Sequence, residues 1–130
     1  MLNKIDFNKM LVPAITMLVI DIFFLYNFAG YIGKMIERIQ NKKFKINYPA
    51  AIACYSIMIF TYYYFIIEKN GNSFDAFILG LSLYSVYETT NMATIDGWQL
   101  KAVVYDSLWG GSLFLLTKVI SDSINRLKPE

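Results

Sequence analysis

The most constraining feature of this chain is an uncharged apolar run at residues 48–67. A helix of about 20 predominantly apolar residues crosses a bilayer core about 30 Å thick, and the run YPAAIACYSIMIFTYYYFII is long enough to do so. With 56% hydrophobic and 17% charged residues among 130, the chain offers too little polar surface for a soluble domain of this size. The sequence therefore predicts an integral membrane protein.

A first span is predicted at residues 10–33, where Asp21 is the one charged residue. Lys4 and Lys9 precede this run, as basic residues precede the apolar part of a signal peptide. However, the apolar part of a signal peptide has about 7 to 15 residues, and this run is longer and contains a carboxylate. We therefore interpret it as a retained membrane span.

Two further segments, residues 73–93 and 100–120, are apolar but interrupted by charges. If they were soluble helices, the protein would have two spans and a mostly apolar appendage. We therefore predict an all-α, polytopic integral membrane protein folded as a four-transmembrane-helix bundle, with residues 1–130 forming a single membrane domain. Four crossings place the N and C termini on the same side of the membrane.

Local signals support the boundaries of the third span. Asn72 or Ser73 can cap its N-terminus, and Asp75 lies favourably in its first turn. Asp96 and Gly97 then form a pair typical of a turn.

The distribution of basic residues bears on orientation. The segment between the first two spans is rich in them, which favours a cytoplasmic location: Lys34, Arg38, Lys42, Lys43 and Lys45. The opposite side carries a nearly equal set: Lys4, Lys9, Lys69, Arg126 and Lys128. We favour the denser segment as the cytoplasmic one.

Polar residues in the last two predicted spans follow the helical repeat. In the third span, residues at i, i+3, i+4 and i+7 share one face: Tyr84, Tyr87, Glu88 and Asn91. The fourth span repeats the first three of these positions with Asp106, Trp109 and Gly110. Gly110, followed by Gly111, permits a close approach between helices. Because a short turn joins the two spans, we expect Glu88 and Asp106 to lie at similar depth.

Asp21, Glu88 and Asp106 are carboxylic acids within predicted spans, without a lysine or arginine at matching depth. A carboxylate in hydrocarbon costs about 2.5 to 3.5 kcal/mol on insertion scales, so these side chains should face the bundle interior. There each must be protonated, hydrogen-bonded, hydrated or paired with a bound cation.

Two interpretations of this polar face remain open. In the first, a buried pocket binds an ion, a proton or a polar lipid headgroup and is lined by Asp21, Tyr84, Tyr87, Glu88, Asn91, Asp106 and Trp109. In the second, the same groups form hydrogen bonds that only fix helix packing. Structural or interfacial roles are predicted for Thr90, Thr94, Trp98 and Gly110, and Trp98 suits anchoring at the membrane surface.

The composition also excludes several kinds of site. The chain has no histidine and one cysteine, so it lacks an internal disulfide, a conventional zinc site and a histidine-based catalytic dyad. Cys54 is predicted to be a small buried hydrophobic residue. The net charge of +2 and the lack of an extended basic surface interleaved with aromatic residues argue against nucleic acid as a partner. No cofactor is predicted.

The motif YETTNMATIDGW, followed by DSLWGG, resembles the membrane family catalogued as domain of unknown function 2177, found in bacteria and some large DNA viruses. The resemblance covers nearly the whole chain. Its pattern includes an acid and a nearby aromatic in span one, here Asp21 and Phe24. The rest of the pattern corresponds to Tyr87, Glu88, Thr90, Asn91, Ala93, Thr94, Trp98, Asp106, Trp109 and Gly110.

This chain departs from the family pattern at Glu88, where aspartate is more usual. Its carboxyl group stands one methylene farther from the backbone, which changes its reach. The resemblance implies an architecture and the position of a site, but no reaction. The abundance of Ile, Asn, Lys and Tyr is typical of an AT-rich genome and would fit a viral source.

Three functions are compatible with these observations. The leading hypothesis is a protein that binds, or also conducts, an ion, a proton or a lipid headgroup. The alternative is a structural membrane subunit of a homo-oligomer or of a larger, viral assembly. The third is an intramembrane lipid-modifying enzyme that uses Glu88 and Asp106 as an acid–base pair. Because the sequence contains no nucleophile, metal-ligand set or phosphate loop that supports catalysis, it favours a non-enzymatic role.

Overall fold

The computed structural model describes residues 5–129 and is all-helical, with no strand in that range. Its elements, in chain order, are α1 (Phe7–Gln40), α2 (Tyr48–Tyr62), the π-helix η1 (Tyr63–Glu68), α3 (Ser73–Thr94) and α4 (Leu100–Arg126). Helix η1 continues α2 without a break, so the two act as one rod.

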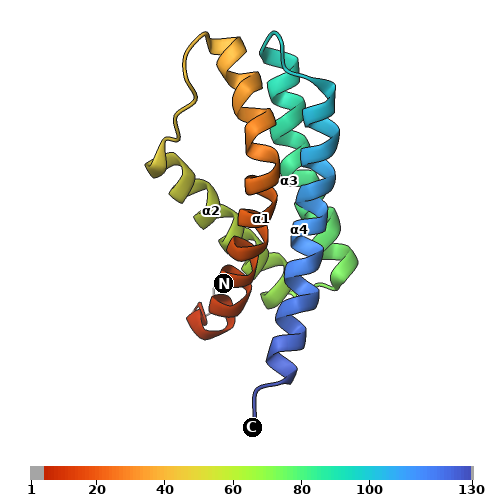
Figure 1. The fold of residues 1–130 in the computed structure, drawn as a ribbon. Coiled ribbons are helices and arrows are strands. Elements are labelled where there is room, and N and C mark those ends of the chain that lie inside the picture. The colour runs from red at the N-terminus through yellow and green to blue at the C-terminus, as the bar shows by residue number, and fades with distance from the viewer. Residues whose placement is uncertain (1–4, 130) are drawn as a thin grey trace.

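Three of the helices, α1, α3 and α4, lie side by side, whereas α2 crosses them obliquely (Figure 1). Helices α3 and α4 form the most extensive pair, and α1 packs against α4. The beginning of α1 and the end of α4 lie at one end of the bundle, and the α3–α4 turn lies with the end of α1 at the other (Figure 1).

Helix α1 is longer than a bilayer core requires. Asp6 caps its N-terminus by accepting hydrogen bonds from the backbone N–H groups of Asn8 and Lys9. Its 34 residues span about 51 Å at 1.5 Å per residue, against about 30 Å of hydrocarbon. The helix continues beyond the predicted span, so Lys34 and Arg38 lie on its last turns and not in the following loop.

The local signals of the third segment are confirmed. Asn72 caps α3, and it forms a reciprocal capping box with Asp75, at N···O distances of 2.7 and 2.9 Å. In the α3–α4 turn, Gly97 has a φ of 86°, which glycine adopts without steric cost. These signals depend on a few adjacent residues, which is why the sequence alone identified them.

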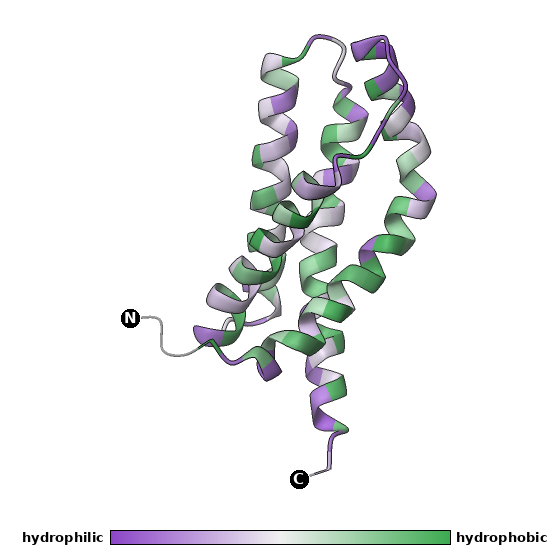
Figure 2. Ribbon diagram, turned by 90° about the vertical axis from the view of Figure 1, so that its left-hand side faces the viewer, coloured by the Kyte–Doolittle hydropathy of each residue, from purple (hydrophilic) through white to green (hydrophobic). Residues whose placement is uncertain are grey.

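Three helical segments are long and apolar enough to cross a membrane: α1, the α2–η1 rod (Tyr48–Glu68) and α4. These are three of the four spans predicted from the sequence. Figure 2 shows hydrophobic residues along the helices and hydrophilic ones concentrated at the two ends. The chain therefore has the character of a multi-pass membrane protein.

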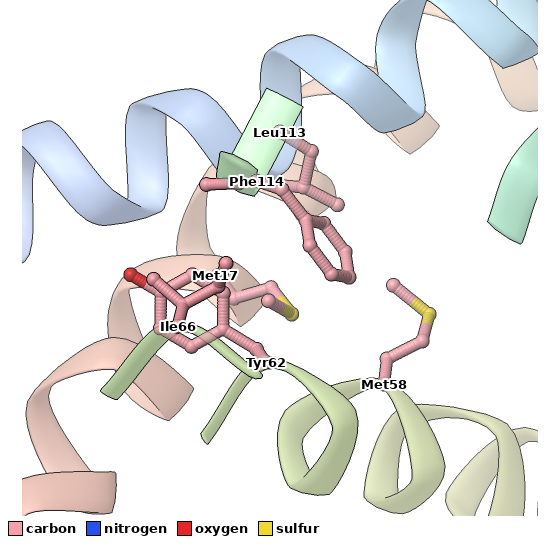
Figure 3. Close-up of a cluster of buried hydrophobic side chains, with 7 residues drawn as sticks. Met17, Met58, Tyr62, Ile66, Leu113 and Phe114 are labelled. Atoms are coloured by element: carbon pink, nitrogen blue, oxygen red, sulfur yellow. The ribbon is translucent and has the colours of Figure 1, made fainter. Parts of the chain in front are cut away.

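The main apolar core lies where all four helices and η1 converge (Figure 3). Its buried members are Met17, Met58, Tyr62, Ile66, Ala76, Leu113 and Phe114. The ring of Phe114 meets Tyr62 edge-on, with centroids 5.8 Å apart. This core holds the oblique α2–η1 rod against the other helices. Cys54 does not join it: the prediction of a buried position was wrong, because Cys54 lies on the exposed side of α2.

Candidate functional site

Asp21 forms a hydrogen-bonded junction between three helices. Its side chain on α1 is only 4% exposed. The indole Nε1 of Trp109, on α4, donates to Oδ1 at 2.8 Å, and the hydroxyl of Tyr55, on α2, donates to Oδ2. Both carboxylate oxygens therefore have a donor, and the two donors come from different helices.

Aromatic rings extend from this junction along the α1–α4 interface. Trp109 stacks on Phe24, with centroids 4.5 Å apart and an interplanar angle of 6°. Phe24 contacts Phe28. The ring centroid of Phe28 in turn lies 5.3 Å from that of Tyr31 and 6.1 Å from that of Tyr105. The stacking fixes the Trp109 ring with its N–H directed at Asp21.

Glu88 and Asp106 form a second polar centre, between α3 and α4. Glu88 is 1% exposed, and its Oε2 accepts a hydrogen bond from Trp98 Nε1 at 2.7 Å. The carboxyl group of Asp106, on α4, is its acidic neighbour. Asp106 is partly buried. The short α3–α4 turn thus brings two carboxyl groups together at one depth.

The helices carrying this pair approach very closely at two glycines. A Cβ on Gly80 would lie 2.1 Å from the backbone oxygen of Gly110, and a Cβ on Gly110 would lie 2.2 Å from Cγ of Tyr84. Real side chains do not tolerate such distances. The small residues therefore set the α3–α4 spacing, and with it the separation of Glu88 from Asp106.

The other predicted lining residues do not all reach this centre. The hydroxyl of Tyr84 lies 4.0 Å from the sulfur of Met58, in the direction of α2. Tyr87 is 56% exposed, and its ring stands edge-on to Trp98 with centroids 6.4 Å apart. Asn91 is partly buried one turn farther along α3. The seven predicted pocket residues are thus divided between two centres and a more open face.

The residues with predicted structural or interfacial roles also lie in different environments. Thr90 and Thr94 are exposed, and the Thr94 hydroxyl donates to its own helix at the Thr90 carbonyl, 2.8 Å away. Thr89 bonds to the Ser85 carbonyl in the same way at 2.6 Å. The indole N–H of Trp98, the residue predicted to anchor at the membrane surface, donates to Glu88.

In the part of the chain that the structure describes, these carboxyl groups form no ion pair closer than 4.0 Å. Within residues 5–129, the one ion pair closer than 4.0 Å is Lys118–Asp122, at 2.9 Å. In the same range, no three His, Cys, Asp or Glu side chains cluster in a way that could hold a metal ion. The compensation present consists of hydrogen bonds from tyrosine and tryptophan.

Tyr55 is the site residue that sequence reasoning missed. It lies in an uncharged span among several tyrosines, so its type alone did not distinguish it. Its position along the span was the signal that could have identified it, because a phenol near the middle of one span can reach a carboxylate at the middle of another.

Comparison with known proteins gives one finding. Curated proteins and solved structures yield no significant match. A family model described as "Predicted membrane protein (DUF2177)" matches residues 7–122, which include all four helices almost entirely and both polar centres. The chain therefore belongs to the DUF2177 family of predicted membrane proteins.

Proposed function

We propose that this protein is a four-span membrane protein whose Glu88–Asp106 pair binds a proton. In this proposal the bundle is one membrane domain, with both termini on the same side of the bilayer. The observation that carries the proposal is the placement of two neighbouring carboxyl groups on the closely packed helices α3 and α4, one of them almost fully buried.

The proposal of a fourth span concerns α3. This helix has 22 residues, about 33 Å, which suffices to cross a hydrocarbon core. It packs side by side with α4, which is apolar enough to span (Figure 1). Its Gly80 fits against the α4 backbone, and this close contact supports placing the two helices at the same depth.

Proton binding follows from electrostatic repulsion between the paired groups. Two neighbouring ionised carboxylates repel each other, and a low-dielectric setting strengthens that repulsion. One shared proton removes a negative charge and adds an O–H donor between the two oxygens. Trp98 can then satisfy the second oxygen of Glu88.

The surroundings of the pair supply an exit for the proton. Trp98, in the α3–α4 turn, donates to Glu88 and contacts the ring of Tyr87, which is more than half exposed. Uptake and release therefore occur at the end of the bundle that contains this turn. The pair acts as a proton-binding centre that responds to the pH on that side.

Infrared spectroscopy of the reconstituted protein at stepped pH tests the proposal. The wild type should show the C=O stretch of a protonated carboxylic acid, and this band should disappear as the pH rises. Glu88→Gln and Asp106→Asn should each abolish it, because each leaves a single carboxyl group. Glu88→Gln retains an acceptor for Trp98, so helical content by circular dichroism should not change.

Asp21→Asn is the matched control, because it removes a buried carboxyl group outside the pair. The band should persist in that variant. A band that survives both pair substitutions would refute the proposal. Its replacement by a carboxylate signal on addition of K⁺ at constant pH would show instead that the pair holds a cation.

A structural role is the second candidate, and the Asp21 junction favours it. Both Asp21 oxygens already accept hydrogen bonds, which joins α1 to α2 and α4. If this role is the main one, loss of Asp21 should disrupt the bundle while loss of the pair should have no effect on proton uptake.

A further inference from the structure

A groove with a volume of about 460 Å³ lies at the end of the bundle where α1 finishes and α3 turns into α4. It is lined by Met35, Arg38, Ile39, Asp96, Gly97 and Gln99. Its volume lies within the range of about 300–1,000 Å³ seen for small-molecule sites. The groove is separate from both carboxyl centres and has no role in the proposed proton binding.

The shape of the groove depends on close packing between α1 and the α3–α4 turn. A Cβ on Gly97 would lie 3.3 Å from Cγ1 of Ile39, so the turn already contacts the end of α1. The positive φ of Gly97 fixes the path of the turn. The two walls of the groove, α1 and the α3–α4 turn, are therefore held together at the contact between Gly97 and Ile39.

The groove presents one cation, one anion and one amide. Arg38 and Asp96 both line it, and neither forms an ion pair within the described residues 5–129. The hydroxyl of Tyr31 donates to Oε1 of Gln99, which fixes the amide and leaves its NH₂ group to donate elsewhere. A ligand matching these groups carries an anionic oxygen group and an N–H cation.

The groove lies outside the hydrocarbon, towards the outer edge of the headgroup layer. With Asp21 at the bilayer centre, Tyr31 lies about 15 Å away along α1, at the edge of the hydrocarbon, and Arg38 about 25 Å away. Lys101 lies 4.9 Å above the centroid of the Tyr31 ring and 5.8 Å from that of Tyr105, an aromatic–cation arrangement suited to the interface. Met35 and Ile39 add apolar surface beside the charged groups.

We propose that this groove binds the headgroup of an aminophospholipid. Arg38 and the Gln99 amide hold the phosphate, and Asp96 accepts hydrogen bonds from the primary ammonium group. A choline headgroup would offer no N–H donor to Asp96. A purely anionic headgroup would leave Asp96 unpaired and repelled.

Native mass spectrometry of the full-length protein tests this assignment. The protein is exchanged into an equimolar mixture of phosphatidylethanolamine, phosphatidylcholine and phosphatidylglycerol with identical acyl chains. We expect about a tenfold preference for phosphatidylethanolamine, which corresponds to about 1.4 kcal/mol. Asp96→Asn should abolish the preference over phosphatidylcholine. Arg38→Gln should lower retention of all three lipids.

Matched variants separate the groove from the general charge of the protein. Lys45→Gln removes the same unit charge in the loop, and Asp122→Asn removes an acid at the other end of α4; both should retain the wild-type preference. Equal retention of the three lipids by the wild type would overturn the proposal. A Lys45→Gln effect as large as that of Arg38→Gln would also overturn it.

The phosphate and ammonium groups could also belong to a soluble molecule. Glycerophosphoethanolamine, which lacks acyl chains, is therefore added as a competitor. We expect it to displace the lipid only in large excess, because it lacks the membrane concentration and apolar contacts of the lipid. Binding of this compound without retention of phosphatidylethanolamine would refute the lipid assignment.

Discussion

Asp21 and Glu88 are both almost completely buried acids, but their hydrogen-bond partners differ in kind. Asp21 has a donor on each oxygen, one phenol and one indole. Glu88 has one indole donor, and the other group facing it is the carboxyl of Asp106. Burial alone therefore does not distinguish a structural acid from a chemically active one. The number and type of donors around the acid make that distinction.

The two centres also differ in the helices that they join. Asp21 connects α1 to α2 and α4, so it holds together elements far apart in sequence. The Glu88–Asp106 pair belongs to α3 and α4, which a short turn and close glycine contacts already hold together. Loss of a hydrogen bond should therefore matter more for stability at Asp21 than at the pair.

The largest expected effect is that of Asp21→Ala, which leaves the Trp109 and Tyr55 donors without their acceptor. Two unsatisfied buried donors should reduce the free energy of unfolding by about 2–5 kcal/mol. Reversible unfolding in mixed micelles, followed by far-UV circular dichroism, measures the change. Asp122→Ala, at a surface ion pair, should cost less than about 1 kcal/mol. Equal losses in the two variants would show that the Asp21 junction contributes no more to stability than a surface ion pair.

Gly80→Ala tests the pair through helix spacing. The new Cβ would overlap the Gly110 backbone, so α3 must move away from α4 at a cost of about 1–3 kcal/mol. Separation of the carboxyl groups should weaken the infrared band of the shared proton. Gly30→Ala is the control, since a Cβ there meets nothing within 4 Å and should stabilise α1 by about 0.5–1 kcal/mol. Similar losses in both variants would contradict the close-contact explanation.

Replacement of each tryptophan by phenylalanine compares the two centres directly. Trp109→Phe preserves stacking on Phe24 but removes one of two donors to Asp21, which should cost about 1–2 kcal/mol. Trp98→Phe should cost about 0.5–1 kcal/mol, because Glu88 keeps its contact with Asp106. The same unfolding assay ranks the two variants. The reverse order would indicate that the pair contributes more to stability than the junction.

The smallest effect is expected for Thr89→Val. The Thr89 side chain is exposed and bonds only to the carbonyl of its own helix, at Ser85. Its replacement by a residue of similar shape should change the free energy of unfolding by no more than about 0.5 kcal/mol. The infrared band should be unchanged. A measurable loss of the band would extend the proton-binding centre to this exposed face.

Features that depend on neighbouring residues were predictable from the sequence. The Asn72 cap, the turn at Gly97 and the apolar helices each follow from short patterns. The i, i+3, i+4 spacing located Glu88 and Asp106 on their helices, and the short connection implied a common depth. The single pocket predicted for all the polar residues was too simple, because helical spacing does not say which neighbour each side chain meets.

Partner choice required the tertiary structure. Tyr55 lies 34 residues from Asp21, and Trp109 lies 88 residues from it. The hydrogen bond from Trp98 to Glu88 likewise depends on the course of the α3–α4 turn. No local pattern encodes these distances, since they depend on how α2 crosses the bundle and how closely α3 approaches α4.

The amino-acid sequence established the membrane class, the helices and the acids that must avoid lipid, because hydropathy and helical periodicity are properties of continuous segments of chain. Only the packed structure assigned Asp21 to a saturated junction and joined Glu88 to Asp106. Hydrogen bonds are short and directional, so the environment of a buried acid is decided only when distant helices are brought to their final separation.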